Sequence, residues 1–163
     1  MQKAILGLDI GGTTIKGGVL INGHLEDIRT IPTPAKESQE FILETIAIFI
    51  ESYLHHDLEG VGIGIPGLVD VEKGIVLGLA NIPAFQHVEL GKFLTERIGK
   101  PIFINNDANC FALGVHKFGV GKKYKNLVGI TLGTGVGGGI VINGLLYSGV
   151  NSAAGEWCSA PYL

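Results

Sequence analysis

Apolar residues near the start of the chain come in short runs that are broken by glycine and polar residues, a pattern typical of β-strands. Residues 3–9 and 14–20 each fit a buried strand. Asn22-Gly23 between two such runs is a strong hairpin signal, and it returns the chain through a third strand at 25–31. The pattern therefore predicts three antiparallel strands.

Farther along, the spacing of apolar residues changes to that of helices. Between positions 41 and 50 they recur every three or four residues, which predicts a helix over about 36–55. Asp107 is expected to be the N-cap of a later helix, on which Cys110 is interpreted as a small apolar filler. The other expected elements, in chain order, are a strand at 61–65, a ribbon around Lys73-Gly74, a helix at about 89–98 ended by Gly99, and a strand at 102–104.

The domain organisation is predicted from a repeat of the opening pattern. Residues 119–125 are polar, glycine-rich and basic, and are interpreted as a hinge. After them a strand, a glycine turn and a second strand follow, as at the start. We therefore expect two related domains, 1–121 and 122–163. We expect the second to be truncated, because a three-strand start without a covering helix cannot bury both faces of a sheet.

Composition limits the class of protein. The chain has 163 residues with 12 basic and 15 acidic side chains, and no basic stripe, which argues against nucleic-acid binding. Two cysteines are too few for a disulfide framework, and the reducing cytoplasm is the expected location. No apolar run approaches the ~20 residues that a membrane span needs. We expect a globular cytoplasmic protein without a membrane partner.

Two glycine-rich turns carry the first candidate chemistry, one at 9–14 and one at 133–139. Glycine lets backbone N–H groups converge on an anion without a Cβ in the way. Two such turns could hold the phosphates of one nucleotide, which predicts a phosphoryl-transfer protein. The candidate phosphate ligands are Gly11, Gly12, Thr13, Thr14, Lys16, Gly133, Thr134, Gly135, Gly137 and Gly138.

A dinucleotide fingerprint is matched twice, at 62–67 and at 133–138, but that motif requires a helix after the turn. Both matches lead into further strand-like runs, so dinucleotide binding is rejected. Asp9, at the end of the first strand, is interpreted as a Mg²⁺ anchor; a plain turn-forming aspartate is the alternative.

Asn105-Asn106-Asp107 lies at the end of a strand, where ligands commonly bind in α/β sheets. A carboxylate there could take the proton from a hydroxyl that attacks a γ-phosphoryl group. For Asp107 taken alone a helix cap is the favoured interpretation, and the two roles are compatible because one oxygen can cap while the other faces the cleft. The five histidines show no metal-ligand spacing with either cysteine, and His55-His56 is placed at a helix end.

Taken together, four segments make the chain resemble the ROK family of bacterial sugar kinases and sugar-responsive repressors, which have an actin/Hsp70-like ATPase fold of the α/β class. The segments are Leu8-Asp9-Ile10-Gly11-Gly12-Thr13, Gly64-Ile65-Pro66-Gly67, Asn106-Asp107-Ala108-Asn109 and Thr131 to Gly139. The resemblance implies an α/β fold with a mixed sheet and helices, and an incomplete second domain.

The resemblance also implies roles for the matching positions. Asp107 would be the catalytic base and Asn106 would bind sugar hydroxyls beside it. Gly67 and Glu156 would line the sugar site, with Asn81 as a weaker sugar-side candidate. The two glycine turns would hold the phosphates of ATP, with Mg²⁺ at Asp9. The family is often dimeric, so a homodimer is possible.

One segment departs from the family pattern. Where the family commonly has Glu-x-Gly-His, this chain reads Glu156-Trp157-Cys158-Ser159, and the family's cysteine-rich zinc segment is not present. Zinc therefore cannot be assigned to this chain, and the identity of the sugar is open.

The resulting hypothesis is an ATP- and Mg²⁺-dependent, glucokinase-like kinase for a hexose or an N-acetylhexosamine. The alternatives are a non-catalytic sugar- or nucleotide-binding fragment and a sugar-sensing regulator. A DNA-binding repressor is disfavoured, because the first strand begins at about Lys3 and leaves no room for a helix-turn-helix.

Overall fold

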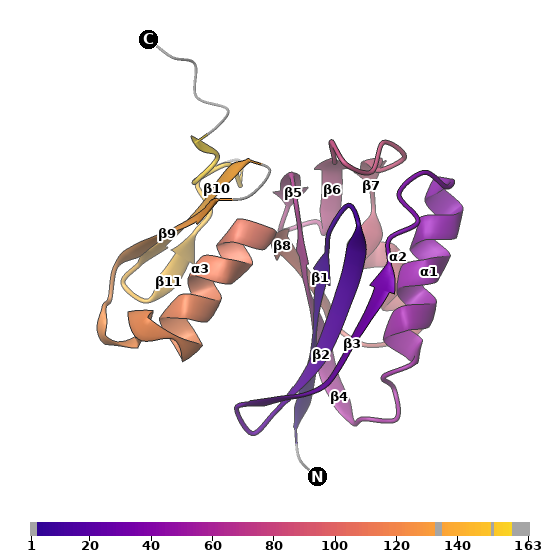
Figure 1. The fold of residues 1–163 in the computed structure, drawn as a ribbon, viewed down its shortest axis with the longest axis horizontal. Helices are drawn as coiled ribbons and strands as arrows, with labels where there is room; N and C mark the ends of the chain where they lie inside the picture. Colours follow the sequence, from indigo (N-terminus) through magenta and orange to yellow (C-terminus); the bar gives the residue numbers. More distant parts are fainter. Residues whose placement is uncertain (1–2, 133–134, 151, 158–163) are drawn as a thin grey trace. The chain divides into compact units, whose positions relative to one another are not determined.

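The computed structural model describes residues 3–132, 135–150 and 152–157. The chain divides into two compact units, Met1–Asn105 and Asn106–Leu163 (Figure 1). The first unit is built on a five-stranded sheet in the order β3-β2-β1-β4-β8. Its strands are β1 (Ala4–Ile10), β2 (Thr14–Ile21), β3 (His24–Pro32), β4 (Leu58–Ile65) and β8 (Ile102–Asn106).

The sheet is mixed. β2 pairs antiparallel with both β1 and β3, which confirms the three antiparallel strands predicted at the start of the chain. β4 pairs parallel with β1. Parallel neighbours need a crossover connection, and the helix between β3 and β4 supplies it.

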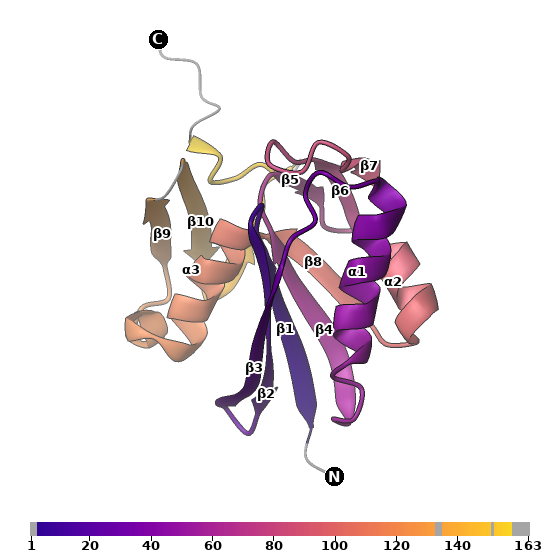
Figure 2. The ribbon, with the colours of Figure 1, turned by 45° about the vertical axis from the view of Figure 1, so that its right-hand side comes forward.

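Two helices cover one face of this sheet. In β1, Leu6, Leu8 and Ile10 are buried while the residues between them are exposed, which is the alternation of a half-buried strand. These side chains share one core with residues of α1 (Gln39–Glu51) and α2 (Leu90–Ile98), and the two helices pack against each other on that face (Figure 2).

The ends of these helices follow local capping chemistry. The hydroxyl of Ser38 accepts a hydrogen bond from the N–H of Phe41, so α1 begins later than the predicted position 36. Gly99 ends α2 with a φ of 70°, a left-handed conformation that glycine adopts at little cost, as predicted.

A second, three-stranded sheet of the first unit has the order β5-β6-β7, with β5 (Leu68–Asp70), β6 (Ile75–Gly78) and β7 (Gln86–Val88). β5 and β6 pair antiparallel, which confirms the ribbon predicted around Lys73-Gly74. β7 was not predicted. Among the described helices, none has the length and apolar character that a membrane crossing requires.

The second unit combines a helix with an antiparallel sheet in the order β11-β10-β9. Its elements are α3 (Asp107–Phe118), the 3-10 helix η1 (Val120–Lys123), β9 (Leu127–Leu132), β10 (Val136–Ile142) and β11 (Leu145–Tyr147). The helix α3 packs on β9 and β10. The units therefore divide ahead of the predicted boundary at 121/122; the two related domains, 1–121 and 122–163, stay a prediction.

Two details of α3 correct the sequence analysis. Asn106, not Asp107, is the N-cap, because the side-chain oxygen of Asn106 accepts from the N–H groups of Ala108 and Asn109. Cys110 is exposed and is not the apolar filler that was expected, since α3 turns Ala108 and Ala112 toward the sheet instead.

Candidate active site

The first glycine turn connects β1 to β2 and is closed by main-chain hydrogen bonds. The N–H of Gly11 donates to the carbonyl oxygen of Thr14 at 2.9 Å. Thr33 braces the turn from the end of β3: its hydroxyl donates to the carbonyl oxygen of Gly11 at 2.6 Å, and its N–H donates to that of Thr13 at 2.9 Å. Sequence reasoning missed Thr33, because its place beside the turn depends on the pairing of β2 with β3.

Asp9 and Lys16 lie at the base of this turn. They are opposite each other in the β1–β2 register, and both are exposed. A carboxylate presented to solvent beside a glycine turn fits a Mg²⁺ ion, which proteins usually hold with one or two carboxylates and phosphate oxygens. Lys16 presents a point charge suited to phosphate.

Two of the predicted glycines make close contacts with protein atoms. A Cβ on Gly12 would lie 2.6 Å from the Cβ of Asn81, closer than real Cβ atoms approach, so glycine is required there. Gly12 and Asn81, the phosphate-side and sugar-side candidates of the first unit, are therefore neighbours. Gly67 has a φ of 81°, and a Cβ there would lie 2.5 Å from the carbonyl oxygen of Gly78.

The second glycine turn is described only in part, since Gly133 and Thr134 lie outside the described residues. Gly135 has open space where a Cβ would stand. At Gly137 a Cβ would lie 2.6 Å from the hydroxyl oxygen of Thr131. A side chain would therefore fit at Gly135, whereas the contact with Thr131 of the adjoining strand requires glycine at position 137.

Gly138 lies beneath the indole of Trp157, and a Cβ at position 138 would overlap the indole ring. The glycine cluster that the sequence attributes to ligand approach is, at this position, needed for packing. Sequence reasoning missed the contact because Trp157 is far along the chain from Gly138. Cys158 and Ser159, where the chain departs from the family pattern, lie outside the described residues.

Asn106, Asp107 and Glu156 are brought together in the second unit. The side-chain oxygen of Asn106 accepts from two helix N–H groups at 2.9 and 3.2 Å, which fixes the orientation of its amide. The amide nitrogen therefore points away from the helix and donates to Oε1 of Glu156 at 3.4 Å. Asp107 is exposed, and its Oδ1 accepts from the N–H of Ala108 at 2.8 Å.

The carboxyl group of Glu156 has a raised pKa. Burial, and then the nearby carboxylate of Asp107, raise the pKa of Glu156 above its ordinary value. Glu156 therefore keeps its proton to a higher pH than an ordinary glutamate does, and in the protonated form it can donate as well as accept a hydrogen bond. Neighbouring carboxyl groups in unequal environments are a frequent feature of acid–base sites.

None of these predicted residues lines the depression of about 370 Å³ on the first unit, which lies near Leu43, His87 and Lys92. The candidate chemistry is instead collected at the turn after β1 with Asn81, and at the start of α3 with Glu156.

The chain matches the ROK family over residues 5–159. It is 41% identical over 158 residues to a glucokinase of Halalkalibacterium halodurans, covering 93% of this chain and 48% of that relative. It is also 41% identical over 154 residues to an N-acetyl-D-glucosamine kinase of Vibrio atlanticus, covering 92% of this chain and 50% of that relative. The chain thus spans about half the length of the curated relatives it matches.

A comparison with a solved structure points to the same family. A ROK family glucokinase from Streptomyces griseus, in complex with glucose and AMPPNP, matches with a TM-score of 0.86 and 35% identity, covering 98% of this chain and 51% of that chain. This likeness confirms the predicted fold class, the actin/Hsp70-like ATPase fold with a mixed sheet and helices.

Proposed function

The chain belongs to the ROK family, and we propose on this premise that it carries the phosphate turns and the catalytic base of an ATP- and Mg²⁺-dependent sugar kinase. The substrate is a hexose or an N-acetylhexosamine, as the names of the relatives suggest. The observation that carries the proposal is the grouping of Asn106 and Glu156 beside the exposed carboxylate of Asp107.

In this proposal Asp107 accepts the proton of the sugar hydroxyl as that hydroxyl attacks the γ-phosphoryl group of ATP. Asn106 is oriented by its capping bonds, so its amide N–H can donate to a sugar hydroxyl. Glu156 binds a further hydroxyl from the other side of that amide. A positioned base of this kind contributes about 10²- to 10⁴-fold in rate.

The nucleotide and the remaining sugar contacts are assigned to the other predicted residues. Residues 9–14 and 133–139 hold the phosphates, while Gly67 and Asn81 line the sugar side of the first unit. Asp9 would hold Mg²⁺ through water or phosphate oxygens, and the ion would supply positive charge to the transferring phosphoryl group. Lys16 adds a second positive charge.

The test is ADP release with Mg-ATP and a panel of hexoses and N-acetylhexosamines. We expect sugar-dependent release, and the sugar with the highest kcat/KM identifies the substrate. Asp107→Asn is expected to lower kcat by about 10²- to 10⁴-fold while sugar affinity, measured by calorimetry, changes little. Asp57→Asn, the same change at an exposed aspartate after α1, serves as the control.

Two results would contradict the proposal. The first is an Asp107→Asn protein that keeps the wild-type kcat. The second is sugar binding by the wild-type protein without any ADP release, which is the behaviour of a sugar-sensing module.

A further inference from the structure

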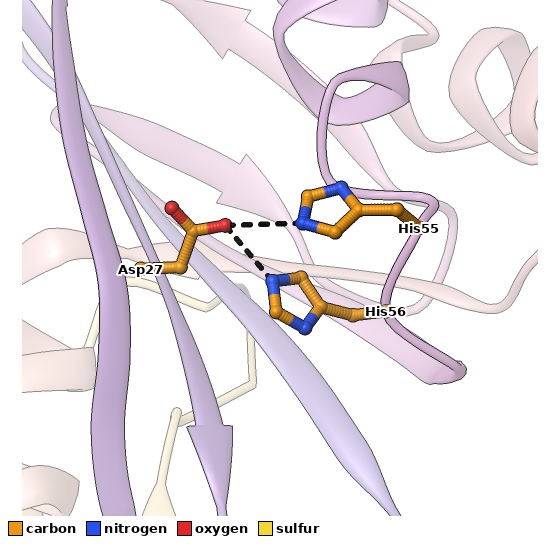
Figure 3. Close-up of side chains that lie close together, drawn as sticks. All are labelled: Asp27, His55 and His56. Atoms are coloured by element: carbon orange, nitrogen blue, oxygen red, sulfur yellow. Dashed lines mark hydrogen bonds and ion pairs between the residues drawn. The ribbon is translucent and has the colours of Figure 1, made fainter.

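Three polar side chains from two segments that are distant in sequence meet at one corner of the first unit. Asp27 comes from β3, and His55 and His56 come from the turns that follow α1 (Figure 3). One possible ligand atom from each residue lies within 4.8 Å of the other two. Oδ2 of Asp27 lies 2.8 Å from Nε2 of His56 and 3.5 Å from Nε2 of His55.

A β-bulge turns Asp27 toward the histidines. Val19 pairs with Glu26 and Gly17 pairs with Arg29, so two residues of β3 stand opposite one residue of β2. Asp27 takes a φ of 48° at this bulge, which is unusual for a residue other than glycine. Bulges commonly re-aim a side chain, and strained backbone of this kind is concentrated at functional sites.

The contacts of His55 settle which ring nitrogen carries its hydrogen. Nδ1 lies 3.0 Å from the carbonyl oxygen of Ser52, and a carbonyl can only accept, so Nδ1 is the donor. In the neutral ring Nε2 then presents a lone pair, and this lone pair faces Oδ2 of Asp27. Two electron pairs that face each other are joined either by a proton or by a metal ion between them. A histidine that donates from one nitrogen to a backbone carbonyl is the usual arrangement of a metal ligand.

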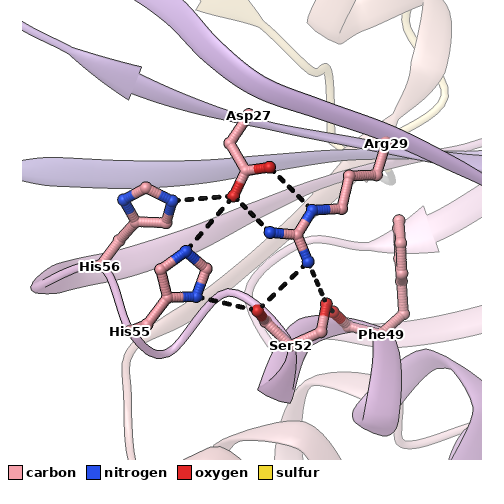
Figure 4. Close-up of polar contacts among 6 residues, drawn as sticks. All are labelled: Asp27, Arg29, Phe49, Ser52, His55 and His56. Carbon is pink, nitrogen blue, oxygen red and sulfur yellow. Dashed lines mark hydrogen bonds and ion pairs between the residues drawn. The ribbon is translucent and has the colours of Figure 1, made fainter.

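The carboxylate of Asp27 is itself held in place. Arg29 donates to Oδ1 and to Oδ2, both at 2.7 Å (Figure 4). Its guanidinium also lies 4.6 Å from the centre of the Tyr53 ring. Each carboxylate oxygen has two acceptor sites, so Oδ2 retains one that points toward the histidines.

We propose that Asp27, His55 and His56 form a binding site for a divalent transition-metal ion, with zinc as the fitting ion. Two imidazole nitrogens and one carboxylate oxygen suit zinc, whereas Mg²⁺ and Ca²⁺ prefer all-oxygen sites. A water molecule completes the tetrahedron, because the site is open to solvent on the side of His55, whose side chain is 57% exposed.

The distances fit this assignment with a small adjustment. Ligand atoms around a tetrahedral zinc ion lie about 3.4 Å apart, given bonds of about 2.0–2.1 Å. The separation of 3.5 Å between His55 and Asp27 already matches. The separation of 2.8 Å between His56 and Asp27 has to widen as the metal replaces the proton that now joins them. The carbonyl groups at the end of α1 add partial negative charge.

The bound ion joins β3 to the turns after α1. Its ligands are separate from those of the proposed kinase chemistry, since none of the three is a predicted sugar, phosphate or Mg²⁺ ligand. This site also differs in kind from the cysteine-rich zinc segment expected of the family.

Zinc titration of the chelator-stripped protein at about pH 7.5, followed by calorimetry, tests the site. We expect one equivalent to bind, and His55→Ala, His56→Ala and Asp27→Asn each to weaken that binding at least tenfold. Asn tolerates a positive φ, so Asp27→Asn spares the bulge. The matched controls on β3, His24→Ala and Glu26→Gln, are expected to bind like wild type.

A second readout separates metal ligation from a structural role. The cobalt(II) form is expected to show the visible spectrum of a tetrahedral nitrogen–oxygen site, and His55→Ala is expected to lose that spectrum while its far-UV circular dichroism stays unchanged. No zinc binding by the wild-type protein, or equal binding by His55→Ala and His24→Ala, overturns the proposal.

Discussion

The two three-stranded meanders of this chain, β1-β2-β3 and β9-β10-β11, follow the same local plan. Each runs through a strand, a glycine turn, a strand, an Asn-Gly turn and a strand. The two Asn-Gly turns have nearly the same φ angles, 51° and 82° at Asn22-Gly23 and 53° and 80° at Asn143-Gly144. Positive φ at both central residues makes the hairpin turn whose twist matches that of the flanking strands. The same Asn-Gly turn chemistry therefore produces the same hairpin geometry in both meanders.

The outer faces of the two meanders differ at the end next to the glycine turn. In the first, the face away from α1 and α2 carries Gly7, Asp9 and Lys16 at that end, whereas the exposed apolar Ile5, Leu25 and Ile28 lie nearer the Asn-Gly turn. In the second, the face away from α3 is apolar. Its side chains are between 50% and 81% exposed within the described residues: Val128, Ile130, Leu132, Leu145 and Tyr147. The local sequence pattern therefore determines the order of strands and turns. Contact with the helix that packs on each sheet determines which strand positions have to be glycine.

The largest effect on stability is expected at Gly139 of the second meander. A Cβ there would lie 2.6 Å from the Cβ of Ala112 and 2.7 Å from the carbonyl oxygen of Ala108, so the backbone of α3 would have to move. Gly139→Ala should cost about 2–3 kcal/mol in free energy of unfolding, in the range of overpacked cores. Urea denaturation followed by the fluorescence of Trp157, the single tryptophan, measures it.

The control is Gly135→Ala in the same hairpin, where a Cβ would meet open space. It should change the free energy of unfolding by no more than about 0.5 kcal/mol. Equal losses in the two variants would mean that contact with α3 is not what requires glycine in β10.

A smaller loss is expected at Gly17 of the first meander. Its nearest neighbour is a side-chain tip, because a Cβ there would lie 2.7 Å from the hydroxyl oxygen of Tyr53. A side chain yields more easily than a helix backbone, so Gly17→Ala should cost about 1–2 kcal/mol. Thermal unfolding followed by circular dichroism measures the loss.

Tyr53 also provides a rescue. Its ring is fully buried, and its hydroxyl has no hydrogen-bond partner among the described residues, so Tyr53→Phe alone should be nearly neutral. The double variant should be more stable than Gly17→Ala alone, because the closest atom is gone. Strict additivity of the two substitutions would show that the hydroxyl is not the obstacle.

The sequence predicted most of what depends on neighbours along the chain. The strands of the first meander, the first two strands of the second, the β5–β6 ribbon and the cap at Gly99 follow from periodicity and turn chemistry. The N-cap was wrong because two adjacent residues, Asn106 and Asp107, are both good caps, and only the geometry of the strand end chooses between them.

What the sequence could not predict depends on pairing between distant segments. Thr33 braces the first turn only because β3 returns beside it. Trp157 packs over Gly138 although the two residues are far apart in the sequence. Asp27 meets His55 and His56 through a bulge whose position no local pattern indicates. At the candidate active site, the grouping of Glu156 with Asn106 was implied only by the family resemblance.

The smallest effect is expected at Glu156 and depends on pH. Because its pKa is raised, the folded protein binds this proton more tightly than the unfolded chain does. That stabilisation is complete below the unfolded pKa of about 4.3 and is lost as the pH rises through the folded pKa. Glu156→Gln keeps the acceptor for Asn106 but does not titrate, so its advantage over wild type should grow as the pH rises from the unfolded pKa of about 4.3 through the raised folded pKa.

Urea denaturation across this pH range measures the gap between the two proteins. Asp107→Asn removes one of the two causes of the shift, so in that background the gap should grow less with pH. A gap that is constant with pH would show that Glu156 titrates alike in the folded and unfolded chain. The grouping of the two carboxyl groups would then have no electrostatic consequence for the stability of the second unit.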